Sequence, residues 1–193
     1  METLNDLLKE ELQDIYSAEK QIIKALPKMI KGVQSDDLKN AISGHLEETR
    51  EQVNRLEKAF TMLGGTARAK HCKGMEGLLE EGAGCLEEHD ESPMRDLLII
   101  GAAQRVEHYE IAAYGTARAI AGQLGMEDVV ELLDETLEEE SNADEKLSEI
   151  AGELYSMVAD GQEDSEKKET TPKARARSEG APKNAGAVRT GTK

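Results

Sequence analysis

The chain has 193 residues, a formal net charge of −16 and no tryptophan. This length suffices for one well-buried domain and a tail. The acidic balance argues against a nucleic-acid-binding body, because phosphate binding needs a basic face. No apolar run approaches the roughly 20 residues of a membrane span. The N-terminus has no basic-then-apolar signal segment, so we expect no membrane insertion and a cytoplasmic location.

The chain is rich in Ala, Leu, Glu and Lys and poor in aromatic residues, which favours an all-helical protein. Two long helices are predicted in its N-terminal half. The first is expected from Thr3 to about Lys31, with Pro27 as a potential kink near its end. A turn over 32–35 leads to the second, from Asp36 to Leu63. Gly64 and Gly65 then follow, as is usual at a helix C-terminus.

A long connection over 65–91 follows, with a short helical pattern over 73–81. Ser92 and Pro93 are a favourable N-cap and first helical residue, and the third long helix is expected to reach Leu124. The fourth is expected from Glu127 to about Val158. Beyond Asp160, residues 161–193 lose hydrophobic periodicity and hold eight basic against five acidic residues, which predicts a disordered, mildly basic tail.

The predicted domain comprises residues 1–160. Within it, residues 92–158 repeat the pattern of residues 1–64. An offset of 91 residues superimposes the apolar positions of the two halves without a gap. Each half is a helix, a turn and a helix. Two antiparallel pairs joined by a long crossover, with its short helix, predict an all-α, ferritin-like four-helix bundle. The alternative is a simple up-down bundle with a structured insertion over 65–91.

One glutamate interrupts the apolar stripe of the first helix in each half, and the offset of 91 maps Glu19 onto Glu110. An unpaired charge in an apolar core is costly, so buried carboxylates are paired, protonated or bound to metal. Two at matching positions predict a shared metal site. The alternative is that each lies at the bundle edge, where the stripe meets solvent.

Further candidate ligands lie on the same predicted faces. On the second helix, His45 and Glu48 are three residues apart and share a face, with Glu51 and Gln52 on adjacent faces. On the third, Glu107 lies one turn before Glu110. On the fourth, the inward-facing candidates are Glu140 and Asp144, the latter as a ligand or as a partner that orients one.

The candidate set departs from the Glu-x-x-His pairs of ferritin-like dinuclear sites. Neither Glu48 nor the run 138–140 has a histidine three residues later. We therefore expect a carboxylate-rich site with at most one histidine. Such oxygen ligands suit two Fe or Mn ions, although they also tolerate Mg²⁺ or Ca²⁺.

At these residues the chain resembles the YciE/YciF-type bacterial ferritin-like proteins. The matching segments occur in every helix and in the crossover, over about residues 3–157: Glu11-Leu12-Gln13-Asp14-Ile15-Tyr16-Ser17-Ala18-Glu19-Lys20-Gln21, Ala25-Leu26-Pro27-Lys28-Met29, His45-Leu46-Glu47-Glu48-Thr49, Cys72-Lys73-Gly74-Met75-Glu76-Gly77-Leu78, Gln104-Arg105-Val106-Glu107-His108-Tyr109-Glu110-Ile111, and Thr136-Leu137-Glu138-Glu139-Glu140 with Ala143-Asp144. The resemblance implies a four-helix bundle, often dimeric, with a dinuclear metal centre and a link to oxidative stress. It brings no established reaction.

Two functions from different classes follow. The first is a stress-associated metalloprotein, whose two metals handle an oxidant such as peroxide or O₂; a homodimer is expected. The second is a non-enzymatic helical scaffold, whose basic tail contacts DNA, a membrane surface or a partner. A large iron-storage cage is a third reading, which no visible feature specifies. Cys72 and Cys85 are expected to be free thiols, with a disulfide as the alternative.

Overall fold

The computed structural model describes residues 2–169 and the side chains of residues 2–160. Within these residues the protein is all-helical. Its five helices, in chain order, are α1 (Leu4–Gly32), α2 (Asp36–Met62), α3 (Lys73–Glu88), α4 (Pro93–Gln123) and α5 (Glu127–Glu169). None of the described helices is long and apolar enough to cross a membrane.

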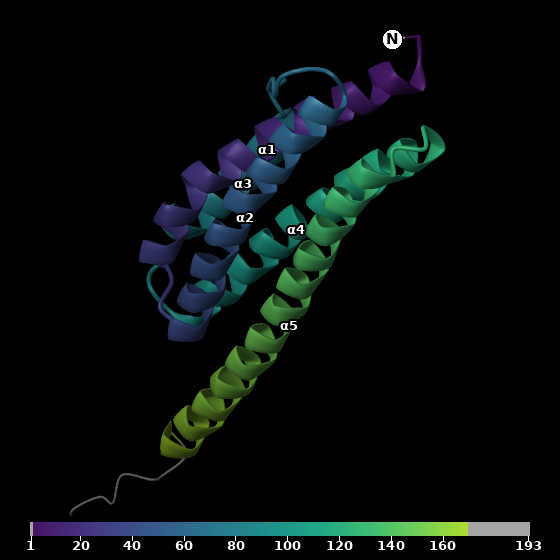
Figure 1. Cartoon of the computed structure of the whole chain (residues 1–193). Helices are drawn as coiled ribbons and strands as arrows, with labels where there is room; N and C mark the ends of the chain where they lie inside the picture. The colour runs from purple at the N-terminus through teal and green to yellow at the C-terminus, as the bar shows by residue number, and fades with distance from the viewer. Residues whose placement is uncertain (1, 170–193) are drawn as a thin grey trace, which may run out of the picture.

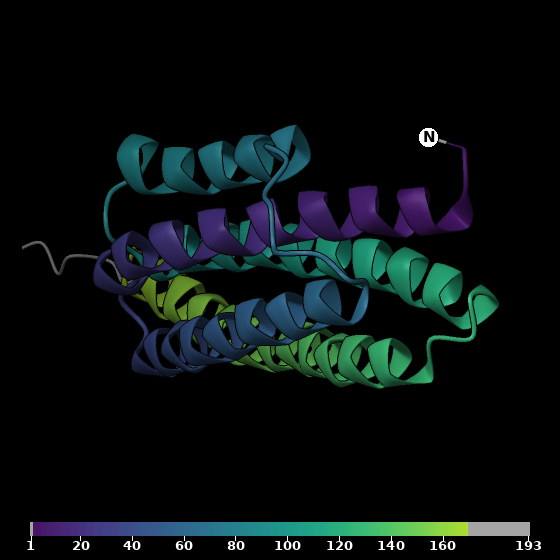
Figure 2. The same cartoon turned by 45° about the horizontal axis from the view of Figure 1, so that its top comes forward.

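The four long helices form a bundle in which α1 packs on α2 and α4, and α5 packs on α2 and α4 (Figures 1 and 2). The connection from α2 to α4 runs the length of the bundle, because α4 begins beside the α1–α2 turn at Gln34. This crossover confirms the predicted ferritin-like architecture and excludes the simple up-down alternative. The short helix α3 lies outside the four, against α1 and α4.

The helix ends follow the sequence signals. Thr3 forms a capping box with Asp6, and Ser35 and Ser92 accept hydrogen bonds from the first turns of α2 and α4. Gly64 and Gly125 have φ values of 73° and 66°, a left-handed conformation that glycine adopts without steric cost. Local chemistry therefore sets where the helices start and stop.

Two elements are longer than predicted. Helix α3 continues to Glu88, past the predicted end of the short helical pattern at residue 81. Helix α5 runs to Glu169, so the predicted domain boundary at Asp160 falls inside a helix. The rest of the predicted tail, residues 170–193, lies outside the described residues.

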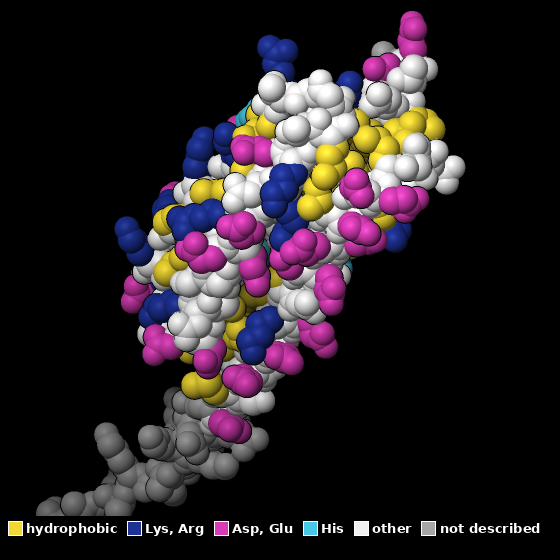
Figure 3. Space-filling view, viewed as in Figure 1, with side chains coloured by type: hydrophobic (Ala, Val, Ile, Leu, Met, Phe, Trp, Pro, Cys, Tyr) yellow, Lys and Arg dark blue, Asp and Glu magenta, His cyan; other side chains and the backbone are white. Residues whose placement is uncertain are grey.

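The core has one apolar cluster at each end of the bundle, a third under α3, and a polar layer between the two ends. One end holds Leu8, Leu12, Phe60 and their neighbours, and the other holds Leu38, Ile99 and theirs. The middle of each long helix contributes buried polar side chains instead: Glu19, His45, Thr49, Gln52, Glu107, Glu110, Thr136 and Glu140. By contrast, the face seen in Figure 3 carries many Asp and Glu side chains in contact with solvent.

A buried carboxylate fixes the α1–α2 turn to the start of α4. Asp96 is 1% exposed, and it accepts hydrogen bonds from the backbone N–H groups of Gln34 (3.0 Å) and Ser35 (2.7 Å). Next to it, the Arg95 guanidinium donates to the carbonyl oxygens of Gly32 and His89. These contacts add to the apolar packing at this end of the bundle.

We predict that Asp96→Ala lowers the free energy of unfolding by about 2–3 kcal/mol, because two buried N–H groups lose a charged acceptor. Urea unfolding followed by circular dichroism measures the change. Asp90→Ala, at an exposed position in the same region, is the control and should change stability by less than about 0.5 kcal/mol. Equal effects of the two substitutions would contradict this account of the turn.

Candidate metal centre

The polar layer contains four buried glutamates and one buried histidine. Glu19 comes from α1, Glu107 and Glu110 from α4, and Glu140 from α5, and each is at most 3% exposed. His45 comes from α2 and is 8% exposed. Every bundle helix therefore supplies at least one potential ligand, and the edge-of-bundle alternative for Glu19 and Glu110 does not hold.

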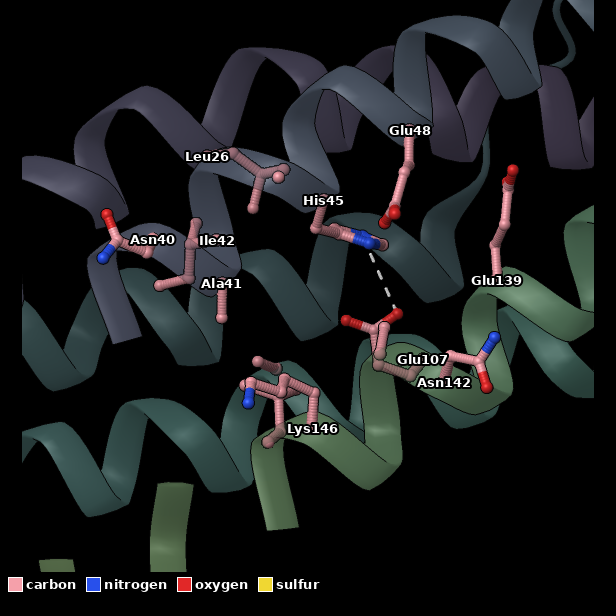
Figure 4. Close-up of a pocket in the computed structure, with 14 residues that line it drawn as sticks. Leu26, Asn40, Ala41, Ile42, His45, Glu48, Glu107, Glu139, Asn142 and Lys146 are labelled. Carbon is pink, nitrogen blue, oxygen red and sulfur yellow. Dashed lines mark ion pairs between the residues drawn. The ribbon is translucent and has the colours of Figure 1, made fainter. Parts of the chain in front are cut away.

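Four of these residues form a tight group. His45, Glu107, Glu110 and Glu140 each offer a ligand atom, and these atoms lie within 4.8 Å of one another. The His45 Nε2 and Glu107 Oε2 atoms are 3.7 Å apart, beyond hydrogen-bond distance (Figure 4). Such separations leave room for a cation between the side chains.

The polar layer carries an unusual number of buried polar atoms without a hydrogen-bond partner. They are Glu19 Oε2, His45 Nε2, Gln52 Oε1, Glu107 Oε2, both carboxylate oxygens of Glu110, and Glu140 Oε2. An unpartnered buried oxygen is costly, and so many together are not expected in a structural hydrogen-bond network. Their convergence fits a set of metal ligands, since a divalent cation satisfies several carboxylate oxygens at once.

The carboxylates also raise one another's pKa. Burial and the neighbouring Glu140 carboxylate raise the pKa of Glu19 to about 8, against a partial lowering by the Tyr114 hydroxyl. Burial raises the pKa of Glu107 and of Glu110 well above the ordinary value, with further contributions from the surrounding glutamates. Without a cation, the centre therefore holds protons at neutral pH.

Side chains that are not candidate ligands position the carboxylates. The Tyr114 hydroxyl, fully buried, donates to Glu19 Oε1 and leaves Glu19 Oε2 free. The Gln52 amide donates to Glu140 Oε1 and also to Glu139 Oε2, at 3.0 Å in the second case. Tyr114 is not among the residues predicted from the sequence, although its place one turn after Glu110 in an apolar stripe is a usable signal.

An arginine ties α2 to α5 beside the centre. Arg55, which is 7% exposed, donates to Thr136 Oγ1 (3.1 Å), to Glu135 Oε1 (3.0 Å) and to Glu139 Oε2. Glu139 therefore already has an arginine and an amide as partners. These partners hold Glu139, the repeat counterpart of Glu48, at the edge of the layer, whereas Glu140 lies on the inward face of α5 as its helical spacing predicts.

Two predicted site residues, Glu48 and Asp144, lie outside the buried polar layer. Glu48 is exposed and lines the rim of a cavity that leads to His45 (Figure 4). Asp144 is half-buried; it accepts a hydrogen bond from the Gln104 amide at 3.0 Å and lies 3.5 Å from His108 Nε2. Of the seven predicted residues, the structure thus brings His45, Glu107, Glu110 and Glu140 together, with Glu19 buried in the same layer.

The fold and the buried layer define a ferritin-like helical protein. In fold it is similar to a ferritin-like diiron-carboxylate protein from Bacillus anthracis, with a TM-score of 0.60 at 18% identity, over 78% of this chain and 99% of that one. At that identity the likeness concerns the fold alone.

Sequence comparison places the chain more narrowly. It belongs to the family described as Domain of unknown function (DUF892), whose model matches residues 3–160. Protein YciF of Escherichia coli (strain K12) is 41% identical over 152 residues, which are 78% of this chain and 92% of that protein. The resemblance noted from the sequence motifs is thereby confirmed.

Two solved structures support this assignment. The crystal structure of the E. coli stress protein YciF superimposes with a TM-score of 0.78 at 40% identity, over 81% of this chain and 99% of that one. The structure of YcfI from Rhodopseudomonas palustris gives a TM-score of 0.74 at 44% identity, over 76% and 94% of the two chains.

We predict that the metal-free protein loses stability as the pH rises from about 5 to about 8. The folded state keeps a proton on Glu19 up to about pH 8, whereas an unfolded glutamate releases it near 4.5. Between these values the unfolded state binds fewer protons, so the free energy of unfolding falls, by at most about 1.4 kcal/mol per pH unit for each such group. Urea unfolding at a series of pH values, in the presence of a chelator, measures the slope.

Glu19→Gln should make this slope shallower, because the amide does not titrate. Glu145→Gln, at an exposed position of α5, is the control and should have the same slope as the parent protein. A metal-free parent protein with no loss of stability over this range would show that these carboxylates ionise freely in the folded state.

Proposed function

We propose that the protein is a stress-associated metalloprotein with a dinuclear Fe or Mn centre in its polar layer. The observation that carries the proposal is a charge balance: four buried glutamates carry four negative charges when ionised, which two divalent cations offset. His45 adds one nitrogen ligand, as expected for iron or manganese. The ligand set is Glu19, His45, Glu107, Glu110 and Glu140.

The chain's own residues prepare this centre in three ways. Glu107 and Glu110 are on one face of α4, so both carboxylates reach the layer from a rigid helix. Tyr114 and Gln52 each occupy one oxygen of a glutamate and leave the other for a cation. The apolar clusters at both ends limit water in the layer, which strengthens electrostatic contacts there. Glu48 and Asp144 flank the ligands.

Iron or manganese would supply redox chemistry to the bound oxidant, for which peroxide or O₂ is the proposed class. Support for a role in stress comes from the relative YciF, which is described as a stress protein of E. coli. The fold itself is a weak argument for a reaction. What this chain contributes is a buried, proton-holding ligand set, which binds cations only as the carboxylates release their protons.

We expect the protein purified from cells, or reconstituted anaerobically with Fe²⁺ or Mn²⁺, to hold close to two metal ions per chain. Elemental analysis, with ultraviolet–visible spectra before and after peroxide addition, measures content and reactivity. Glu19→Ala and Glu110→Ala should each lower the content by at least half, because each removes a carboxylate with free oxygens. Glu138→Ala, exposed on α5 next to the candidate ligands, is the control and should keep the parent content.

If the parent protein binds neither ion under these conditions, the scaffold alternative takes the place of the metalloprotein. That alternative depends largely on residues 170–193, outside the described residues, and no contact in the described part favours it.

A cytoplasmic homodimer remains part of the proposal. Cys72 and Cys85 are both free thiols, which suits a reducing compartment. Exposed apolar side chains at the start of α4 and the end of α5, among them Met94, Leu98, Tyr155 and Met157, support self-association. Analytical ultracentrifugation gives the oligomeric state directly.

A further inference from the structure

A cavity of about 380 Å³ opens between α2 and α5 and reaches the candidate metal centre (Figure 4). Its rim is formed by exposed residues, including Asn40, Glu48, Asn142 and Lys146. Its deeper wall is mainly aliphatic: Leu26, Ala41, Ile42, Ala103, Ala143 and Leu147. Mostly apolar concave sites of this size, with a few convergent polar groups, are typical of small-molecule pockets.

Two buried polar side chains lie at the floor of the cavity. His45 and Glu107 both line it, and His45 Nε2 and Glu107 Oε2 are buried without a hydrogen-bond partner. Their separation of 3.7 Å is too long for a direct hydrogen bond. A hydroxyl group, which donates one hydrogen bond and accepts others, could contact both atoms at once.

The apolar space continues past this pair. A second cavity of about 90 Å³ lies under α3 and is lined by Ile22, Met29, Leu79 and Val106 among others. The two cavities share Leu26, Ile42, His45, Ala103 and Glu107. An apolar ligand at the floor therefore has aliphatic walls on both sides of its polar group.

The charges around the cavity select against an anionic ligand. Glu48 and Glu139 lie at the rim and Glu107 at the floor, whereas the one cation among the lining residues is Lys146. The Lys146 ammonium already lies 3.3 Å from the Glu149 carboxylate. A ligand carboxylate or phosphate would face repulsion from Glu48 at the rim, and at the buried floor it would lose its hydration without gaining a cationic partner.

From these observations we infer that the α2–α5 cavity binds a small neutral organic molecule with an aliphatic body and a hydroxyl or hydroperoxide group at His45 and Glu107. In the metal-free protein the polar group contacts these two side chains directly; in the metal-loaded protein, where the same atoms would hold a cation, the aliphatic walls of the cavity carry the binding. That the cavity is the substrate site of the metal centre rests on the proposed function. If it is, the class of oxidants extends from peroxide and O₂ to organic hydroperoxides.

The test uses 1-octanol as the probe and octanoate as its anionic counterpart, with the full-length protein in metal-free and metal-loaded forms. Calorimetric titration should show saturable binding of 1-octanol to the metal-free form, and at least about tenfold weaker binding of octanoate. Amide chemical shifts along 41–45, 103–107 and 143–147 should change on addition of 1-octanol. The metal content of each sample, measured in parallel, tests the proposed function separately.

Ala103→Leu and Ala143→Leu fill the cavity from α4 and from α5, and each should weaken 1-octanol binding by at least about tenfold. Ala112→Leu, at an exposed position of α4, is the matched control and should bind as the parent does. Two cavity-filling variants are used so that poor folding of one leaves the other to decide. Thermal melts identify a variant that does not fold.

Absence of saturable 1-octanol binding, equal binding of octanoate, or unchanged binding by a folded cavity-filling variant would each overturn the inference, even if the protein holds two metals. Conversely, 1-octanol binding in a protein that takes up no metal would support the cavity and refute the proposed centre.

Discussion

The structure depends on the burial of four carboxylates in the middle of a helical bundle. Ionised glutamates close together in an apolar interior repel one another and lose their hydration, so they need protons or cations. The raised pKa values of Glu19, Glu107 and Glu110 express this cost in the metal-free protein. The same cost is what makes the layer a strong candidate for cation binding.

The rest of the fold keeps these side chains from turning to solvent. Arg55 and Gln52 join α2 to α5 beside the layer, and Asp96 joins the α1–α2 turn to α4 at one end. Apolar clusters close the bundle on both sides of the layer. Because the helices are fixed at several points, rotating one helix to turn its glutamate toward solvent would break buried hydrogen bonds elsewhere.

The two halves are repeats in sequence, but they are not equivalent around the centre. On α5, Glu140 faces inward, and the preceding Glu139 accepts hydrogen bonds from Arg55 and Gln52 of α2. On α2 the inward residue is His45, and Glu48 remains at the surface. This asymmetry leaves one side of the layer facing an open, mostly aliphatic cavity between α2 and α5. The cavity and the candidate metal centre therefore meet at His45 and Glu107, which belong to both.

The sequence alone determined the four long helices, the crossover and the interior position of Glu19, Glu110 and Glu140. These follow from apolar periodicity, capping residues and an internal repeat, which are all local or repeated along the chain. Only the tertiary structure decided that Arg55 and Gln52 hold Glu139, that Glu48 stays at the rim, and that Tyr114 supports Glu19. The physical reason is that these outcomes depend on partners from other helices, which helical spacing does not encode.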